Sequence, residues 1–176
     1  MPSSDSLAVL AVLTLVLSVL AVPIAGATAQ ADEPTVTVPE QVGVGVDGTT
    51  TVTFALDSAP NGVAGYDLSA SVADDSVATI TGVSVDSPFE RLGNRTGVED
   101  GGAGAYANGV DLNKQVEPNA TDVALVTLTI EGETDGWTTL SLPSVNVDTD
   151  DGNSIQPDTQ VATINVGDAR SSGDGT

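Results

Sequence analysis

Apolar and polar residues alternate in short segments along most of the chain from Thr35 onward. In the segment Thr49–Leu56 every second residue from Val52 is apolar, and the segment Asp122–Ile130 ends in the same pattern, with threonines between the apolar positions. Successive side chains of a β-strand point to opposite faces, so the apolar set of each segment should share one buried face. The sequence therefore predicts a core between two sheets that includes Val52, Phe54, Leu56, Val126, Leu128 and Ile130.

Segments of this kind recur every 10 to 15 residues or so and are bounded by Gly, Pro, Asn and Asp, which is typical of an all-β domain. Outside the N-terminal segment no stretch keeps the 3.6-residue apolar period of a helix. A long segment, Asp86–Gly104, carries Pro88 and five glycines and is expected to be an excursion between strands. The expected strands are Thr35–Val38, Val42–Val46, Thr49–Leu56, Ala64–Ser71, Val77–Val85, Ala103–Val110, Asp122–Ile130, Trp137–Leu142 and Gln160–Val166.

The N-terminal segment differs from the rest because Leu7–Val22 is an almost unbroken apolar run. It is followed by two overlapping A-x-A sequences within Ala27–Ala31, which are typical of signal-peptide cleavage sites. The run of about 16 residues is shorter than the roughly 20 that a spanning helix prefers, so cleavage is favoured over an uncleaved membrane anchor. We expect a signal peptide over 1–31, a domain over 32–167 and a polar tail over 168–176, in a protein that is secreted or held at the cell surface.

Charge adds a second constraint. The chain has 25 acidic and 4 basic residues, a formal net charge of −21, and a single lysine, Lys114. Such a charge repels nucleic acid and anionic lipid, so we expect no nucleic-acid partner, and a membrane only if the leader is uncleaved. It would also destabilise a compact state unless salt screened the repulsion. The near-loss of lysine favours a secreted protein of a salt-in halophile, such as an archaeon, over an acidic calcium-loaded domain from a moderate environment.

The residue types present argue against an enzyme. Without His and Cys, the chain cannot build a Ser-His-Asp or Cys-His arrangement or a His-based zinc site, and no disulfide can stabilise the domain. Paired carboxylates could still serve a glycosidase. However, the nominal pairs Asp74-Asp75 and Asp150-Asp151 are adjacent in sequence, so on a strand they would point to opposite faces. We expect no catalytic residues.

An acidic segment near the C-terminus resembles a calcium-binding loop in composition. Its oxygen-bearing side chains surround Gly152, but the register of an EF-hand loop fails by one residue, because Thr149 and Val147 fall at ligand positions. A β-hairpin turn is the favoured interpretation. We expect no cofactor, with weak binding of calcium as the alternative. The candidate cation ligands are Asp148, Asp150, Asp151 and Asn153.

Two features bear on carbohydrate. Asn94 and Asn119 each begin an N-x-T sequon in a predicted loop, so either is a candidate glycosylation site. The chain has only five aromatic residues, too few for an obvious sugar-stacking strip. For the single tryptophan, Trp137, packing in the core or against an edge is the favoured interpretation.

Three segments in order resemble the cohesin family, the secreted β-sandwich modules that hold dockerin domains. The first is Asn61–Val85, with a turn, a Gly-Val-Ala start, an aromatic–acidic pair, an acidic corner and a Val/Ile-rich strand. The second, Asp122–Leu142, contains Glu131-Gly132 and the Trp137 strand, and the third, Val145–Val166, contains an Asp-Gly-Asn turn and a final Val/Ile strand. The resemblance covers roughly Thr35–Val166.

This resemblance implies an antiparallel β-sandwich of jelly-roll type with about nine strands. It also implies a non-catalytic extracellular module with a dockerin-type protein partner. An Asp on the strand after the Gly-x-Ala start contacts the dockerin in cohesins, and Asp67 matches it, with Tyr66 and Gly65 beside it. Gly65 stands where family members often have Asn. The alternatives are a carbohydrate-binding module that acts in polysaccharide binding or breakdown, and a structural surface or adhesion module.

Overall fold

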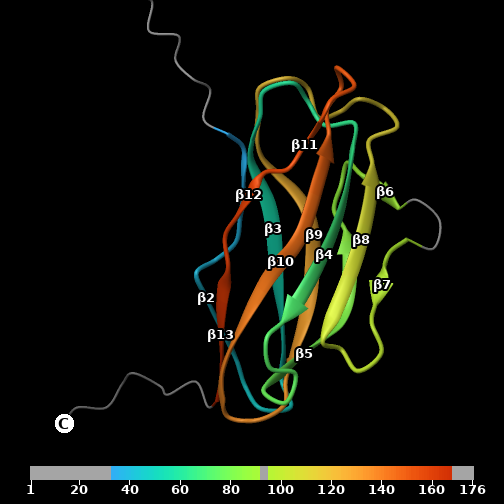
Figure 1. Ribbon diagram of the computed structural model, residues 1–176. Coiled ribbons are helices and arrows are strands. Elements are labelled where there is room, and N and C mark those ends of the chain that lie inside the picture. The colour runs from blue at the N-terminus through green and yellow to red at the C-terminus, as the bar shows by residue number, and fades with distance from the viewer. Residues whose placement is uncertain (1–32, 92–94, 168–176) are drawn as a thin grey trace, which may run out of the picture. The chain divides into compact units, whose positions relative to one another are not determined.

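The computed structural model describes residues 33–91 and 95–167. The predicted signal peptide, the predicted tail and the candidate glycosylation site Asn94 therefore lie outside the described residues. The described residues form two β-sheets packed face to face, and contain no helix of the length and hydropathy that a membrane span requires (Figure 1). The prediction of an all-β sandwich is confirmed.

One layer is a five-stranded sheet in the order β12-β1-β3-β9-β5. Its centre is the long antiparallel pair of β3 and β9, in which Thr51 lies opposite Thr129 and Thr53 opposite Thr127. Threonines occupy much of the outer surface of this sheet, as the alternation in the sequence requires. The strands are β1 (Thr35–Thr37), β3 (Thr49–Ala59), β5 (Ala78–Val85), β9 (Ala120–Gly132) and β12 (Asp158–Thr159).

The other layer is an eight-stranded sheet whose main path runs β2-β13-β10-β4-β8-β6, with β11 paired to β10 and β7 paired to β8. In Figure 1 it is the sheet that carries the orange β10 beside the green β4. Its strands are β2 (Gln41–Val44), β4 (Gly65–Val72), β6 (Glu90–Arg91), β7 (Gly97–Val98), β8 (Gly104–Val110), β10 (Gly136–Asp148), β11 (Ser154–Ile155) and β13 (Ala162–Val166).

All nine expected strands are present, with ends that differ by a few residues. Four two-residue strands were not expected: β6 and β7 lie within the Asp86–Gly104 excursion, and β11 and β12 lie between β10 and β13. The pairing is not purely antiparallel either, because β1 runs parallel to β12 and β2 runs parallel to β13. Both parallel pairs join segments far apart in the chain, which local turn chemistry cannot predict.

Strand β10 extends six residues beyond its expected end at Leu142. The expectation failed because Pro143 follows, and proline cannot donate a backbone hydrogen bond. The pairing with β4 shifts at this point, from Ser141 opposite Ser71 to Ser144 opposite Ser69, so that Pro143 falls in a β-bulge or irregularity and the ladder then resumes.

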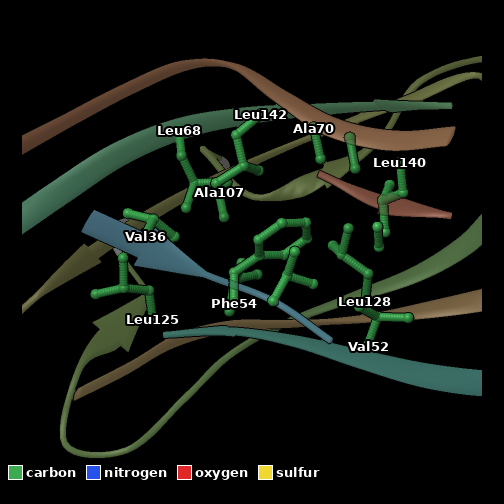
Figure 2. Close-up of a cluster of buried hydrophobic side chains, with 14 of the residues drawn as sticks. Val36, Val52, Phe54, Leu68, Ala70, Ala107, Leu125, Leu128, Leu140 and Leu142 are labelled. Carbon is green, nitrogen blue, oxygen red and sulfur yellow. The ribbon is translucent and has the colours of Figure 1, made fainter. Parts of the chain in front are cut away.

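The core lies between the two sheets. Figure 2 shows Phe54 among side chains from both layers, with Leu68 and Leu140 on one side and Val52 and Leu128 on the other. The six residues predicted from the alternation are all buried, with exposed fractions of 1% or less. This confirms both the register of β3 and β9 and the face that each presents to the other sheet.

Candidate functional site

The outer face of the eight-stranded sheet carries a row of polar side chains across β10, β4 and β8. Along β4, Leu68 and Ala70 point into the core while Asp67 and Ser69 lie at alternate, more accessible positions. Asp67 is exposed, in agreement with its predicted place on an accessible strand face. Its place in the middle of three paired strands follows from the register of β4 with β8 and β10.

Asp67 lies between two asparagines. Its cross-strand partners are Asn108 on β8 and Asn146 on β10, and Asn108 Nδ2 donates a hydrogen bond to Asp67 Oδ2 at 3.3 Å. Asn108 Oδ1 is buried and accepts no hydrogen bond from the residues that the structure describes. The next row along the strands holds Ser69 between Tyr106 and Ser144. We call Asp67, Asn108 and Asn146 the Asp67 patch; it offers one carboxylate between two amides.

Tyr66 was predicted to bind a partner, and this prediction is wrong. Its side chain is only 2% exposed and lies in the core, as the strand alternation requires for the neighbour of an exposed Asp67. The hydroxyl donates a hydrogen bond to the carbonyl oxygen of Leu125, and the ring meets Phe89 edge-to-face at a centroid distance of 5.0 Å. Burial, with a smaller contribution from Asp86, raises the pKa of the Tyr66 hydroxyl above its usual range.

Gly65 is likewise a packing position and not a partner contact, because it is buried. A Cβ added there would lie 2.8 Å from the carbonyl oxygen of Gly109 on β8. Gly109 in turn leaves room for the Tyr66 ring, since a Cβ added to Gly109 would lie 2.4 Å from a ring carbon of Tyr66. The two glycines therefore let β4, β8 and the tyrosine ring pack closely.

The acidic segment forms a hairpin turn, which confirms the favoured interpretation. β10 pairs with β11, and within the turn the Gly152 amide bonds to the carbonyl oxygen of Thr149, with Gly152 at a φ of 86°. Hydrogen bonds from the Thr149 hydroxyl and from the Asn153 amide to Asp151 hold the pKa of that exposed carboxyl below its usual range.

Two of the carboxylates proposed as cation ligands, Asp148 and Asp151, accept hydrogen bonds within this turn. Asp148 accepts a hydrogen bond from the Ser154 hydroxyl, while an Asp150 oxygen lies close to Gly62 in another loop. No group of three acidic side chains within residues 33–91 and 95–167 is placed to hold a metal ion. Calcium binding by Asp148, Asp150, Asp151 and Asn153 stays a prediction of the sequence.

The second sequon lies where a modification could reach it. Asn119 is exposed in the turn before β9 and adopts a φ of 69°, a conformation that asparagine tolerates better than most residues. Its glycosylation stays a prediction.

Trp137 is not packed in the core or against an edge as expected: 61% of its surface is exposed. It is the second residue of β10 and faces outward, opposite Asn165 of β13, while its neighbour Thr138 is buried. The alternation contained this information, because Thr138, Leu140 and Leu142 are two residues apart and Trp137 has the opposite parity. The size of the indole ring had outweighed that pattern in the sequence-based interpretation.

The architecture is similar to that of solved cohesins. The non-cellulosomal cohesin from the hyperthermophilic archaeon Archaeoglobus fulgidus matches with a TM-score of 0.62 and 17% identity, over 78% of this chain and 94% of that chain. A chain of the Coh-OlpA–Doc918 complex, a type I cohesin–dockerin complex from Clostridium thermocellum, matches with a TM-score of 0.62 and 13% identity. The match covers 77% of this chain and 99% of that chain.

A cohesin module from a family 33 glycoside hydrolase of Clostridium perfringens matches with a TM-score of 0.58 and 10% identity, over 77% of this chain and 96% of that chain. No protein-family model and no curated protein matches the sequence. At such low identities the likeness concerns the fold alone. The chain has the cohesin fold.

Proposed function

We propose that this chain is a non-catalytic binding module that holds a dockerin-type protein through the outer face of its eight-stranded sheet. The observation that carries the proposal is the Asp67 patch, an exposed carboxylate between two asparagines on a sheet face. The fold supports the proposal as well, because a chain of the Coh-OlpA–Doc918 cohesin–dockerin complex has a similar architecture.

The chemistry of the patch suits a protein surface. Asp67 accepts hydrogen bonds and the Asn146 amide can both donate and accept them, while Asn108, whose Oδ1 is buried, can donate from Nδ2. Together these groups can match backbone and side-chain groups of a partner. Hydrogen bonds to a charged group are stronger than those between neutral groups. In concentrated salt, long-range attraction is screened, so short-range hydrogen bonds and packing at this patch would carry the affinity.

We place this activity outside the cell or at its surface. The support is the leader-like sequence 1–31, with its apolar run and A-x-A sequences, together with an acidic composition suited to a saline medium. Mass spectrometry of the native protein tests this placement, with an expected N-terminus at Gln30 or Asp32. An intact leader on the native protein would contradict cleavage.

The binding proposal is tested by titration calorimetry of the domain with purified dockerin domains in molar KCl. Asp67→Ala should weaken binding by about 10- to 100-fold, the loss expected when hydrogen bonds to a charged group disappear. Asn146→Ala should weaken it less. The matched control is Glu131→Ala, which removes an acid from the outer face of the five-stranded sheet and should leave affinity unchanged.

Two results would contradict the proposal. One is wild-type affinity in Asp67→Ala, which would move the interface off this patch. The other is no heat of binding with any dockerin domain while the protein remains folded, which would remove the proposed class of partner.

A further inference from the structure

A second surface on the same sheet has a different composition from the Asp67 patch. It lies where β10, β13 and β2 run side by side, and two rows of outward residues cross these three strands. We call it the Trp137 patch; its first row is Trp137, Asn165 and Gly43, and its second row is Thr139, Thr163 and Gln41.

The patch is accessible and uncharged. Trp137, the only tryptophan of the chain, is 61% exposed, and Asn165, Thr139 and Gln41 are also exposed. None of the six positions is charged, in a chain with 25 acidic residues. Acidic residues border the patch: the Asp135 carboxylate lies beside Gly167, two residues beyond Asn165, and the Asp74 amide donates a hydrogen bond to the hydroxyl of Thr138, the neighbour of Trp137. A large exposed indole beside uncharged polar residues is informative, because aromatic rings are costly to leave in water.

The floor of the patch is open next to the amide of Asn165. A Cβ added to Gly43, the residue opposite Asn165 on β2, would have no atom within 4 Å. Neighbouring strands are about 4.8 Å apart, and outward residues of one strand repeat every 6.6 Å or so. Hydroxyl and amide groups therefore lie beside the indole, on β10 and β13, at distances comparable to the width of a sugar ring.

We propose that the Trp137 patch binds a neutral sugar ring of a polysaccharide. The indole would stack on the C–H face of the ring, and the Asn165 amide with the hydroxyls of Thr139 and Thr163 would bond to its equatorial hydroxyls. The open position at Gly43 lets the chain of sugars continue over β2 toward the edge of the sheet. The ligand is neutral because the net charge of −21 repels an anionic polymer and no basic side chain lies in the patch to offset it.

The surroundings of Trp137 favour a sugar over a protein partner. A tryptophan that anchors a protein interface sits in a well-packed site from which water is excluded. Here the adjacent outward positions are amides, hydroxyls and glycine. The exposed apolar side chain of Val161, which precedes β13, lies four residues from Asn165, about 13 Å along an extended chain.

The Trp137 patch is separate from the Asp67 patch. Trp137 and Asn146 lie on the same strand nine residues apart, which corresponds to roughly 25–30 Å of strand. A sugar at one end and a protein at the other can therefore be bound together. The inference does not depend on the identity of the partner at Asp67.

Fluorescence tests the inference directly, because all tryptophan emission comes from Trp137. The probes are cellohexaose, chitohexaose, xylohexaose and maltohexaose, each added to the full domain in molar KCl to about 10 mM, well above a Kd of 1 mM. We expect one of these neutral oligosaccharides to shift the emission to the blue and to protect it from acrylamide. Oligogalacturonate, which is anionic, should cause neither change.

Variants locate the binding. Asn165→Ala should weaken the fluorescence response by about tenfold, whereas Asn146→Ala, an amide on the same sheet but in the Asp67 patch, should leave it unchanged. Retention on insoluble cellulose, chitin or starch should fall by about 10- to 100-fold in Trp137→Ala and be partly restored in Trp137→Phe.

Three outcomes would overturn the inference. The emission could remain unchanged with every neutral oligosaccharide, or respond equally to the anionic one, or shift only when a dockerin domain is added. The last outcome would make Trp137 part of the protein interface. Loss of dockerin binding in Asp67→Ala, with the sugar response intact, would separate the two proposals.

Discussion

At the scale of single residues, the core can be tested at Phe54. Its ring is completely buried and meets side chains from both sheets (Figure 2). Phe54→Ala should lower the free energy of unfolding by about 3–5 kcal/mol, because it leaves a cavity in a closely packed core. Urea denaturation measures this change, with Leu112→Ala, at a 64% exposed position, as the control. A loss below about 1 kcal/mol would mean that the ring is not buried in solution.

The buried hydroxyl of Tyr66 predicts a loss of stability at high pH. In the unfolded chain this group ionises near a pKa of about 10, whereas burial raises its pKa in the folded state. Its contribution is therefore complete below about pH 10 and is lost as pH rises above that value toward the folded pKa. Wild-type stability should fall more steeply than that of Tyr66→Phe over this range, while Tyr106→Phe, at an exposed ring, should follow the wild type.

Tyr66→Phe should also cost about 0.5–1.5 kcal/mol at neutral pH, since the hydrogen bond to Leu125 is lost. Equal alkaline slopes in the wild type and Tyr66→Phe would contradict an unusual ionisation of this tyrosine.

Tyr66 and Trp137 show what residue-level prediction missed and why. Asp67 was placed correctly on an exposed face, and the same alternation puts Tyr66 inside, together with Leu68 and Ala70. The resemblance to cohesins had instead grouped Tyr66 with its neighbour in sequence. For Trp137 the general tendency of large aromatics to pack outweighed the parity of its strand. In both cases the period-2 pattern was the better guide.

At the scale of elements, strands were predictable and their irregularities were not. Leu125 is buried beside Val126 because β9 contains a bulge, where the pairing with β3 steps from Phe54–Val126 to Ala55–Ala124. The Leu125 carbonyl then accepts hydrogen bonds from the Asp86 amide and from Tyr66. Both donors lie far from Leu125 in sequence, so no local pattern indicates that this carbonyl is satisfied.

The acidic hairpin yields a prediction about one turn. Gly152→Ala should lower the free energy of unfolding by about 1–2 kcal/mol, because Gly152 has a φ of 86°, which a residue with a Cβ adopts only with strain. The matched control is Gly45→Ala. A Cβ meets no atom within 4 Å at either glycine, and only Gly152 has a positive φ. Thermal unfolding of both variants measures the difference, and equal stabilities would mean that the turn relaxes without strain.

At the scale of the whole molecule, an all-β fold was predictable because nine segments with the period of strands must pack sheet on sheet to bury their apolar faces. The order of the strands within each sheet could not be predicted. The parallel pairs β1–β12 and β2–β13 join chain segments more than a hundred residues apart, and their geometry depends on how the sheets close at their edges. The Trp137 patch depends on the parallel pairing of β2 with β13, because this pairing brings Gly43 and Asn165 together.

The net charge of −21 gives the last prediction, which concerns the stability of the whole domain. At about 0.1 M salt the Debye length is about 10 Å, so neighbouring acidic side chains repel one another across the surface, whereas at about 1 M it is about 3 Å and this repulsion is largely screened. The melting temperature, followed by circular dichroism, should therefore rise steeply with KCl over this range. Potassium sulfate at equal ionic strength should raise the melting temperature by a similar amount at the low end of the range, because screening depends on ionic strength. Stabilisation through the exclusion of salt from apolar surface depends instead on the anion. A melting temperature independent of KCl would show that the acidic surface is not a source of instability and would contradict a halophilic origin for this composition.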